Sequence, residues 1–428
     1  MQQHDVRTAV VDDLEWRRMI ADHTDLDALR STMAAGPIAF YGGFDPTAPS
    51  LHFGNLVLLV TMRRLQMAGH RPIGLVGGAT GLVGDPSGRT SERTLHERDV
   101  IGEWVEHIRS QVRRYLSFEG SNAAIIVNNL DWTASMSAID WLRDIGKHFS
   151  VSRMLAKEAV SARMEAGGIS YTEFSYQVMQ ALDFLELYRR HGCILQMGGS
   201  DQWGNLTAGV DLIRRVEGAT VHALATPLIT RPDGEKFGKS TGSTLWLDPA
   251  KTSPFAFYQW FLNVDDTVVG TYLRVFSFRS RAEIEEFEAS VVARPDAREA
   301  QRSLASEVTA LVHGADTAAA AAEASQALFG DGDLASLDAA TLETAFADLP
   351  RASLRDPMPS VLDLLVESGL SESRGQARRT LNEGGAYVNN QRVTDATAVP
   401  EQSELLAGRW LLLRRGKRNL AVAEVAER

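Results

Sequence analysis

The chain has 428 residues, 44% of them hydrophobic and 23% charged, a composition typical of a soluble globular protein of about two to four domains. The formal net charge of −11 argues against a protein that coats nucleic acid non-specifically. A single cysteine, Cys193, excludes an intrachain disulfide and argues against a Cys-based zinc site, and no protein-bound metal is predicted. The sequence has no secretory signal pattern and no apolar run near the ~20 residues of a membrane span, so a cytoplasmic protein is predicted.

The first elements along the chain are predicted strands that alternate with helices. Pro37–Tyr41 and Arg71–Gly78 are predicted strands, and residues 50–69 between them have helical spacing, with Ser50 as the predicted N-cap. Further strands are predicted at residues 123–127, 193–197 and 221–226. This alternation predicts an α/β fold with a Rossmann-like, doubly wound parallel sheet that binds ligands at the carboxyl ends of its strands.

The C-terminal part of the chain has a different pattern. Residues 246–325 are predicted to form an α-helical domain, residues 326–357 an acidic, Ala-rich linker, and residues 358–428 a small α+β module. Residues 351–428 contain 12 Lys and Arg against 10 Asp and Glu, a net charge of +2, whereas residues 1–350 carry −13. The C-terminal module is therefore predicted to hold a local basic site.

The segment "FYGGFDPTAPSLHFGN", residues 40–55, combines a strand end, paired glycines and the first turn of a helix. A helix N-terminus presents free N–H groups and favours an anion, and Thr47 and His52 can add neutral donors for a phosphate. A histidine at such a position, taken alone, is more often a simple capping residue.

The segment "PDGEKFGKSTGS", residues 232–243, resembles a phosphate-binding loop. A Walker A loop needs four residues between its glycines, but Gly234 and Gly238 enclose only three. Lys236 and Lys239 flank Gly238, so both ammonium groups can reach one side of a loop and stabilise the charge of a phosphoryl or adenylyl transfer. In isolation the same pattern also fits a solvated surface loop.

The segment "YTEFSYQVMQALDFL", residues 171–185, has helical spacing and an unusual polar face. Tyr176, Gln180 and Asp183 lie at i, i+4 and i+7, so a phenol, an amide and a carboxylate share one side of the helix. The opposite face is apolar and predicted to pack into the core; it consists of Phe174, Val178, Ala181, Leu182 and Leu185. We interpret the polar face as a ligand pocket, the alternative being an ordinary amphipathic surface helix.

Several long motifs, taken in order, resemble the bacterial-type tyrosyl-tRNA synthetase family of class I aminoacyl-tRNA synthetases. These are "YGGFDPTAPSLHFGN", "LVGGATGLVGDPSGRTSER", "YTEFSYQVMQALDF", "LQMGGSDQWGN" and "KFGKS". The resemblance extends from about Arg18 to the end, where the tail resembles an S4-like RNA-binding domain. It implies a catalytic domain over residues 1–225 with a dimer-interface insertion at about 115–190, a mobile ATP-binding loop over 226–245, and a homodimer that joins L-tyrosine to tRNA-Tyr with ATP and Mg²⁺.

The resemblance also implies roles for individual residues. Tyr41 and Asp183 would bind the phenolic hydroxyl of tyrosine, Tyr176, Gln180 and Asp85 its α-ammonium group, and Gln202 its carboxylate. The implied ATP-binding residues are Gly43, Asp45, Gly54, Asn55, Asp201, Lys236, Lys239 and Ser240, and the implied catalytic residues are Thr47, His52, Lys236 and Lys239. The implied tRNA contacts are Arg374, Arg378, Arg379, Arg414, Arg415 and Lys417. Asp201 has an alternative role as the N-cap of the helix that begins near Gln202.

Three departures from the family pattern and three alternative functions remain. Asn55 stands where the family commonly has His, Leu58 where it often has a polar residue, and Gly42 where some members have a side chain near the ribose.

The alternative functions are a tryptophanyl-tRNA synthetase, in which the hydroxyl-binding pair would be misplaced, a P-loop kinase, which the short loop opposes, and a non-catalytic RNA-binding paralogue. The intact set of site residues argues against the last.

Overall fold

The computed structural model describes residues 3–87, 96–165, 167–229, 244–329, 333–416 and 419–425. The chain divides into two compact units, of which the first comprises Met1–Asp248 and Gly270–Ile284 and the second Pro249–Val269 and Glu285–Arg428. None of the helices in these described ranges is both long and apolar enough to span a bilayer.

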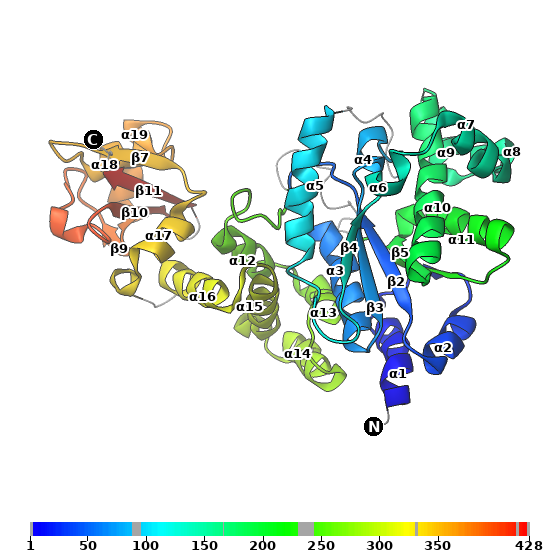
Figure 1. The fold of residues 1–428 in the computed structure, drawn as a ribbon. Coiled ribbons are helices and arrows are strands. Elements are labelled where there is room, and N and C mark those ends of the chain that lie inside the picture. The colour runs from blue at the N-terminus through cyan, green and yellow to red at the C-terminus, as the bar shows by residue number, and fades with distance from the viewer. Residues whose placement is uncertain are drawn as a thin grey trace. The chain divides into compact units, whose positions relative to one another are not determined.

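A six-stranded sheet forms the centre of the first unit (Figure 1). Its strands are β1 (Asp22–His23), β2 (Ala39–Phe44), β3 (Arg71–Val76), β4 (Ile125–Asn128), β5 (Cys193–Gly199) and β6 (His222–Thr226). Their order is β1-β6-β5-β2-β3-β4, and all neighbours are parallel except the antiparallel pair β1 and β6. The predicted α/β sheet is confirmed, whereas β1 was missed because two residues are too short for a periodic pattern.

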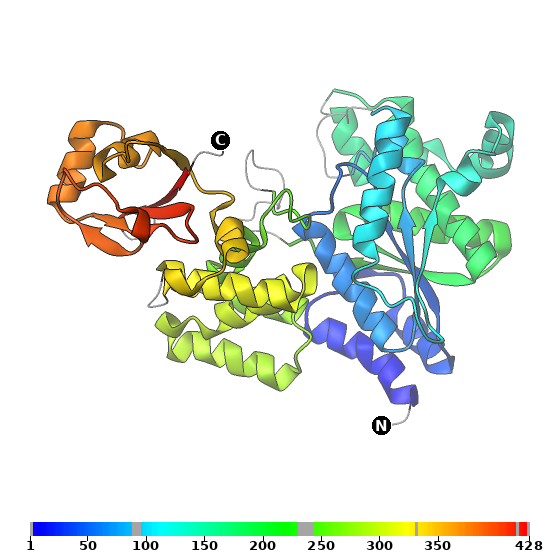
Figure 2. The same ribbon diagram turned by 60° about the vertical axis from the view of Figure 1, so that its left-hand side comes forward.

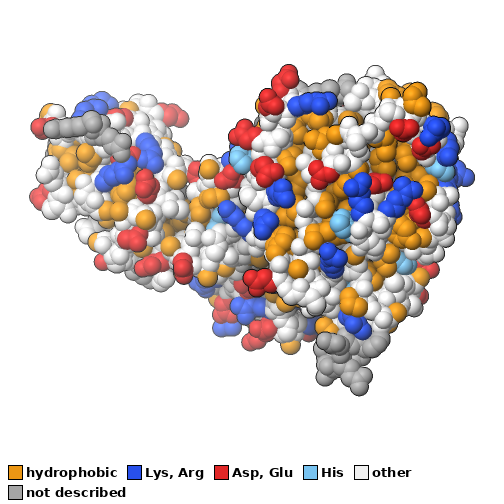
Figure 3. Space-filling model, in the orientation of Figure 1, with side chains coloured by type: hydrophobic (Ala, Val, Ile, Leu, Met, Phe, Trp, Pro, Cys, Tyr) orange, Lys and Arg blue, Asp and Glu red, His pale blue; other side chains and the backbone are white. Residues whose placement is uncertain are grey.

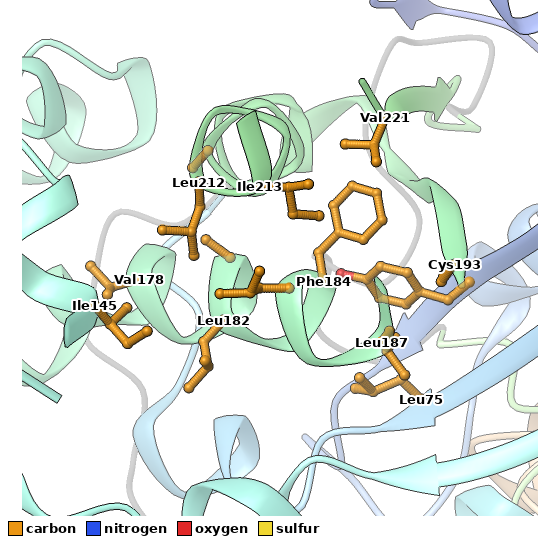
Figure 4. Packing of buried hydrophobic residues seen from close by; sticks show 14 of the residues in the cluster. Leu75, Ile145, Val178, Leu182, Phe184, Leu187, Cys193, Leu212, Ile213 and Val221 are labelled. Carbon is orange, nitrogen blue, oxygen red and sulfur yellow. The ribbon is translucent and has the colours of Figure 1, made fainter. Parts of the chain in front are cut away.

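Helices cover both faces of this sheet. The helices of the first unit are α1 (Gln3–Trp16), α2 (Leu26–Ala35), α3 (Phe53–Met67), α4 (Thr80–Val83), α5 (Arg98–Val112), α6 (Leu130–Thr133), α7 (Ala138–Asp140), α8 (Val151–Leu155), α9 (Glu158–Glu165), α10 (Tyr171–His191) and α11 (Trp203–Glu217). Side chains of α10, α11 and the sheet meet in one buried cluster (Figure 4). It contains Val178, Ala181, Leu182 and Leu185, with Phe174 packed against it, so the predicted apolar face of α10 is confirmed.

The strand order determines where a ligand can bind. The chain passes from β2 outward through β3 to β4, and then returns to the other side of β2 with β5 and β6. The direction of winding therefore reverses between β2 and β5, and loops at the carboxyl ends of these two strands separate to leave a crevice. The segments that follow β2 and β5 carry the two motifs "FDPTAPSLHFGN" and "GGSDQWGN".

The second unit begins with helices and ends in a five-stranded sheet (Figure 2). Its helices are α12 (Pro254–Leu262), α15 (Glu299–His313), α16 (Ala315–Phe329), α17 (Ala339–Phe346), α18 (Val361–Glu367) and α19 (Arg374–Asn382), while α13 (Asp266–Phe276) and α14 (Arg281–Ala293) have residues in both units. The sheet has the order β7-β11-β10-β8-β9, built from β7 (Arg351–Leu354), β8 (Ala386–Val388), β9 (Gln391–Val393), β10 (Trp410–Arg415) and β11 (Asn419–Val425).

The segment predicted as a linker, residues 326–357, is largely part of this module. It contains α17 and β7, and β7 pairs in parallel with β11. Leu342 and Phe346 of α17 are fully buried in a cluster with Trp410 of the sheet. The alanine-rich composition suggested a tether, but a few large apolar residues at helical spacing are sufficient to dock the segment on the sheet.

Candidate active site

A cavity of about 360 Å³ lies at the carboxyl ends of β2 and β5 in the first unit. It is lined by the predicted site residues Tyr41, Gly43, Asp45, Thr47, His52, Gly54, Asn55, Asp85, Tyr176, Gln180, Asp183, Asp201 and Gln202. Lys236, Lys239, Ser240 and Lys417 lie outside the described residues. Residues from four separate parts of the chain are thus brought to one cavity at the place that the strand order favours.

Asp183 of α10 is held at the cavity by two donors. Its carboxylate oxygens accept hydrogen bonds from Trp132 Nε1 at 2.9 Å and from Asn129 Nδ2 at 3.0 Å. The side chain is buried, and burial raises the pKa of Asp183 to about 7 although both hydrogen bonds oppose the rise. The carboxylate is therefore fixed in position and close to half-ionised at neutral pH.

Tyr41 of β2 lines the same cavity with a hydroxyl group that has no partner among the described residues. Its side chain is only 2% exposed, and burial followed by the charge of Asp183 raises the pKa of Tyr41 well above its usual value. The hydroxyl therefore keeps its proton at neutral pH. An unpaired buried hydroxyl costs about 1–3 kcal/mol, so its presence beside a cavity indicates a ligand with a matching polar group.

Two further carboxylates surround Tyr176 of α10. The Tyr176 hydroxyl donates to Asp45 Oδ2 at 2.6 Å, and Gln202 Nε2 donates to Asp85 Oδ2 at 2.5 Å. Burial, and then the charge of Asp45, raises the pKa of Tyr176 well above its usual value. The middle of the cavity is thus a region of negative potential, which suits an ammonium group.

Asp45, which the family resemblance assigns to ATP, is hydrogen-bonded to Tyr176. The motif comparison placed it on the nucleotide side, but its two oxygens accept from Tyr176 and from Thr80 Oγ1, the latter at 2.6 Å. A Cβ at Gly77 would lie 2.0 Å from Asp45 Oδ1, so only glycine permits this approach. Gly77 therefore makes room for Asp45 in the carboxylate network.

His52 is the N-cap of α3, and the predicted N-cap, Ser50, is wrong. His52 Nδ1 accepts from the Gly54 N–H at 3.1 Å, and Asn55 Oδ1 accepts from the His52 N–H at 3.0 Å, which together form a capping box. Ser50 is buried two residues earlier, and its hydroxyl donates to the Leu51 carbonyl at 2.7 Å. Because Nδ1 accepts, a neutral His52 ring carries its proton on Nε2.

The part of the cavity beside β2, the start of α3 and the end of β5 contains the remaining predicted residues. Gly43, Thr47, Gly54 and Asn55 line it beside β2 and the start of α3, and Asp201 lines it after β5. The N-cap of α11 is Gln202 rather than Asp201, so the alternative capping role of Asp201 is wrong. Gly42 and Leu58 are two of the departures from the family pattern. A Cβ on Gly42 would lie 2.6 Å from Met62 Sδ, and the Leu58 side chain forms an apolar part of the cavity wall.

Asn129, Trp132 and Thr80 are functional candidates that the sequence reading missed. Asn129 is fully buried, donates to both Asp183 and Thr80, and accepts from the Ala79 N–H at 2.7 Å. The stretch "NNLDW", residues 128–132, directly follows the end of β4, where polar residues of a parallel sheet converge. Its position could have indicated a role, but only the fold shows that it reaches α10.

The predicted tRNA-binding arginines differ in their surroundings. Arg374 forms an ion pair with Asp363, and Arg415 Nη1 donates to the Leu370 carbonyl at 2.7 Å. Arg378 and Arg379 are exposed on α19. The Arg414 guanidinium lies over the ring of Tyr387, with its central carbon 4.1 Å from the ring centre.

Across the described ranges, no group of three or more His, Cys, Asp or Glu side chains has an arrangement that could hold a metal ion.

Comparisons with known proteins agree with this site. Residues 33–330 match the family of class I tRNA synthetases for Trp and Tyr, and residues 341–423 match the tyrosine–tRNA ligase SYY-like C-terminal domain. The chain is 60% identical over 420 residues to a tyrosine–tRNA ligase of Streptomyces coelicolor, covering 98% of this chain and 99% of that one. It is 56% identical over 418 residues to the tyrosine–tRNA ligase of Mycobacterium tuberculosis, covering 97% and 98%.

A solved structure shows the same architecture. A C-terminally truncated mitochondrial tyrosyl-tRNA synthetase of Aspergillus nidulans superposes with a TM-score of 0.67 at 31% identity, covering 73% of this chain and 92% of that one. The near full-length relatives and the family matches therefore agree with the geometry of the cavity. The chain belongs to the tyrosine–tRNA ligases, a family of class I aminoacyl-tRNA synthetases.

Proposed function

We propose that the cavity of the first unit carries out both steps of tyrosine–tRNA ligation. In the first step L-tyrosine and ATP form tyrosyl-adenylate and pyrophosphate, and in the second the tyrosyl group passes to the 3′ end of tRNA-Tyr. The observation that carries this assignment is the unpaired, buried hydroxyl of Tyr41 beside the buried carboxylate of Asp183. A phenol offers one donor and one acceptor, and it matches these two groups.

The amino acid is oriented by charge along the cavity. Its phenolic hydroxyl donates to Asp183 and accepts from Tyr41, while its α-ammonium group lies among Tyr176, Gln180 and Asp85. Gln202, which is held by Asp85, is near the carboxylate. Phenylalanine would leave the buried Tyr41 hydroxyl without a partner and would bring no donor to Asp183, which opposes its binding.

The chemical step needs position and charge stabilisation rather than a general base. The tyrosine carboxylate is already ionised, and one of its oxygens forms a bond to the α-phosphorus as the bond to the pyrophosphate oxygen breaks. Thr47 and the Nε2–H of His52 donate to the departing phosphates, and Lys236 and Lys239 add positive charge. ATP enters with Mg²⁺ on its phosphates, where oxygen ligands suit this ion.

The second step uses the same positioned adenylate. A terminal ribose hydroxyl of the tRNA attacks the tyrosyl carbonyl carbon, an ester bond forms, and the bond to AMP breaks. We propose that Asp201 holds the ribose of the adenylate during both steps, and that Gly43, Gly54 and Asn55 contact its nucleotide. ATP and tRNA are cytoplasmic substrates, in agreement with the proposed cytoplasmic location.

Pyrophosphate exchange into ATP tests the assignment directly. The assay is run with each of the twenty amino acids, in the absence of tRNA. Exchange with tyrosine alone supports the proposed pocket. Exchange with tryptophan would assign the cavity to a tryptophanyl-tRNA synthetase instead. No exchange from folded protein would overturn the proposal.

The pH dependence of tyrosine use follows from Asp183. Burial raises the pKa of its carboxyl group to about 7, so this group becomes protonated as the pH falls through neutrality and loses the negative charge that makes it a strong acceptor for the substrate hydroxyl. We expect kcat/KM for tyrosine to fall by up to about tenfold per pH unit below about 7. Trp132→Phe removes a donor that stabilises the ionised form, so the midpoint should move to higher pH.

This profile is measured by pyrophosphate exchange between about pH 5.5 and 8.5, with the KM for ATP as the internal control. A midpoint that Trp132→Phe leaves unchanged would contradict the positioning role of Trp132. A profile that is flat through neutral pH would contradict the role of Asp183 as an acceptor.

We propose that a second copy of the chain covers an apolar surface of the first unit. Large hydrophobic side chains are exposed between α7 and α10, namely Ile139, Leu142, Val151, Leu155, Met164 and Tyr171. Hydrophobic side chains reach the surface near α7 and α9 in Figure 3. These residues fall within the expected dimer-interface insertion, residues 115–190, and such clusters favour association.

Sedimentation tests the dimer. The native protein should sediment at twice the 46.8 kDa of the chain. Leu142→Glu should shift it toward the monomer, because the substitution places a charge in an apolar contact. Leu130, whose side chain is also exposed but lies outside residues 139–171, offers a matched Leu→Glu control. A native protein that sediments as a monomer would contradict the proposal.

A further inference from the structure

Several arginines of the C-terminal module have no carboxylate partner in the part of the chain that the structure describes. Arg355, Arg374 and Arg409 form ion pairs with Glu367, Asp363 and Glu424, respectively. Within the described part of residues 351–425, five other arginines form no ion pair: Arg378, Arg379, Arg392, Arg414 and Arg415. In a chain of net charge −11, a module that leaves so many cations unpaired is suited to a polyanion.

These unpaired arginines lie on two sides of the sheet. Ala386 and Val388 of β8 pack in one cluster with Ala377 and Leu381 of α19. Because side chains alternate along a strand, Tyr387 between them points to the opposite face. That face also carries Trp410 and Leu412 of β10, which pack with Phe346 of α17.

Arg392 and Arg414 lie on the same face as Tyr387. Tyr387 is in direct register with Arg414 of β10 on one side and with Arg392 of β9 on the other. Residues opposite one another in a sheet share a face, so the three side chains form a cross-strand row. Arg378 and Arg379 belong to α19 on the other face, so this row is a separate basic site.

The row has a defined geometry. The Arg414 guanidinium carbon lies 4.1 Å from the centre of the Tyr387 ring, and that of Arg392 lies 5.7 Å away. Arg392 Nη2 also donates to the Tyr387 hydroxyl at 3.3 Å. Two guanidinium groups are thus ordered by one aromatic ring at the β9 edge of the sheet.

A purely structural role in the sheet is a weaker explanation for this row of side chains. In the same sheet, Arg351 and Arg409 both pair with Glu424 of β11, and Arg409 also pairs with Glu343, so two carboxylates offset the two positive charges. Around Tyr387, two like charges share one ring without a carboxylate partner among the described residues, an arrangement that costs stability unless an anion binds. Arginine planes combined with an aromatic ring are the usual components of sites that stack an unpaired base.

We propose that Tyr387, Arg392 and Arg414 form a binding site for one unpaired nucleotide of the tRNA. The base stacks on the layer formed by the Tyr387 ring and the arginine planes, and the adjacent phosphate accepts from Arg392. This inference rests on the proposed function, since that function makes tRNA the ligand of the second unit. It adds a base-stacking contact to the phosphate contacts expected from the α19 arginines.

The test compares variants of the full chain in their affinity for tRNA-Tyr, measured by fluorescence anisotropy at several salt concentrations. Tyr387→Leu removes the ring and should weaken binding roughly 5- to 100-fold, the range for loss of one base–aromatic stack. Tyr387→Phe keeps the ring and should stay within about twofold of the native protein. Arg414→Gln should weaken binding and lower the salt slope by about 1.

Two controls define the site. Arg355→Gln removes an exposed arginine of the same module that is already paired with Glu367, so it should change the affinity by less than about twofold. A blunt RNA duplex has no unpaired base, so Tyr387→Leu should leave its binding unchanged. Thermal unfolding of each variant checks that the sheet is intact. Arg414→Gln keeps the ring of Tyr387, so it tests the site independently of Tyr387→Leu.

The outcomes separate this inference from the proposed function. Tyrosine-dependent pyrophosphate exchange needs no tRNA and should be unchanged in all four variants. If exchange is normal but Tyr387→Leu and Arg414→Gln bind tRNA-Tyr like the native protein, the site is overturned. Equal losses with Tyr387→Phe and Tyr387→Leu would overturn the stacking contact. Absence of exchange from the native protein would instead overturn the proposed function.

Discussion

Asp183→Asn should reduce kcat/KM for tyrosine by about 10²- to 10⁴-fold in pyrophosphate exchange. The substitution removes the charged acceptor for the substrate hydroxyl. It also places an amide N–H₂ against a neighbouring donor, either Trp132 Nε1 or Asn129 Nδ2, both of which now donate to the carboxylate. Loss of a hydrogen bond to a charged group and the unsatisfied buried donor each contribute on the order of 1.5–3 kcal/mol.

The loss should appear almost entirely in the use of tyrosine. Asp183 and Tyr41 line the cavity, and we propose that His52 and Asn55, rather than this pair, contact ATP, so the KM for ATP should change by less than about threefold. Asp131→Asn is a matched control, because Asp131 is an exposed aspartate next to Trp132. A variant at Asp183 that retains native kcat/KM for tyrosine would remove the main support for the proposed pocket.

His52→Ala should slow formation of tyrosyl-adenylate by about 10²- to 10³-fold, the usual effect of removing one fixed donor from a developing negative charge. His52 lies at the start of α3, and its Nδ1 already accepts from the Gly54 N–H at 3.1 Å. The proton of a neutral ring is therefore on Nε2, the nitrogen that we assign to the departing phosphate. The same substitution removes the N-cap and costs about 1 kcal/mol of stability.

His52→Asn separates these two effects. Asparagine is among the strongest N-caps, so its side chain should restore the stability lost in His52→Ala. Its shorter amide does not reach the position of Nε2, so the slow adenylate formation should persist. Single-turnover kinetics with native and variant protein measures the chemical step, and equilibrium dialysis measures tyrosine affinity, which should be nearly unchanged. A large loss of tyrosine affinity in either variant would contradict the assignment of His52 to the phosphates.

Both predictions concern residues that the sequence pattern had already selected. The spacing of Tyr176, Gln180 and Asp183 predicted a polar helix face, and the glycines near the end of β2 together with His52 predicted an anion site. These signals are local, since helical periodicity and capping depend on residues within one or two turns. The same locality explains the error at Ser50, where a good capping residue stands two positions before the helix begins.

The contacts that tune the site are long-range. Tyr176 and Asp45 are 131 residues apart, Gln202 and Asp85 are 117 apart, and Trp132 is 51 residues from Asp183. No local pattern links these pairs. They meet because the order of strands brings the ends of β2, β4 and β5 toward α10, and that order depends on how the helices pack on the two faces of the sheet.

The sequence by itself determined the alternation of strands and helices, the chemical character of the cavity and the family resemblance, because all three depend on residue type and order along the chain. The tertiary structure alone decided which carboxylates face one another, how deeply they are buried, and hence the raised pKa of Asp183. It also decided that Tyr387 lies between two arginines from different strands. Burial and charge proximity are properties of the packed chain, and they exist only after distant segments have come together.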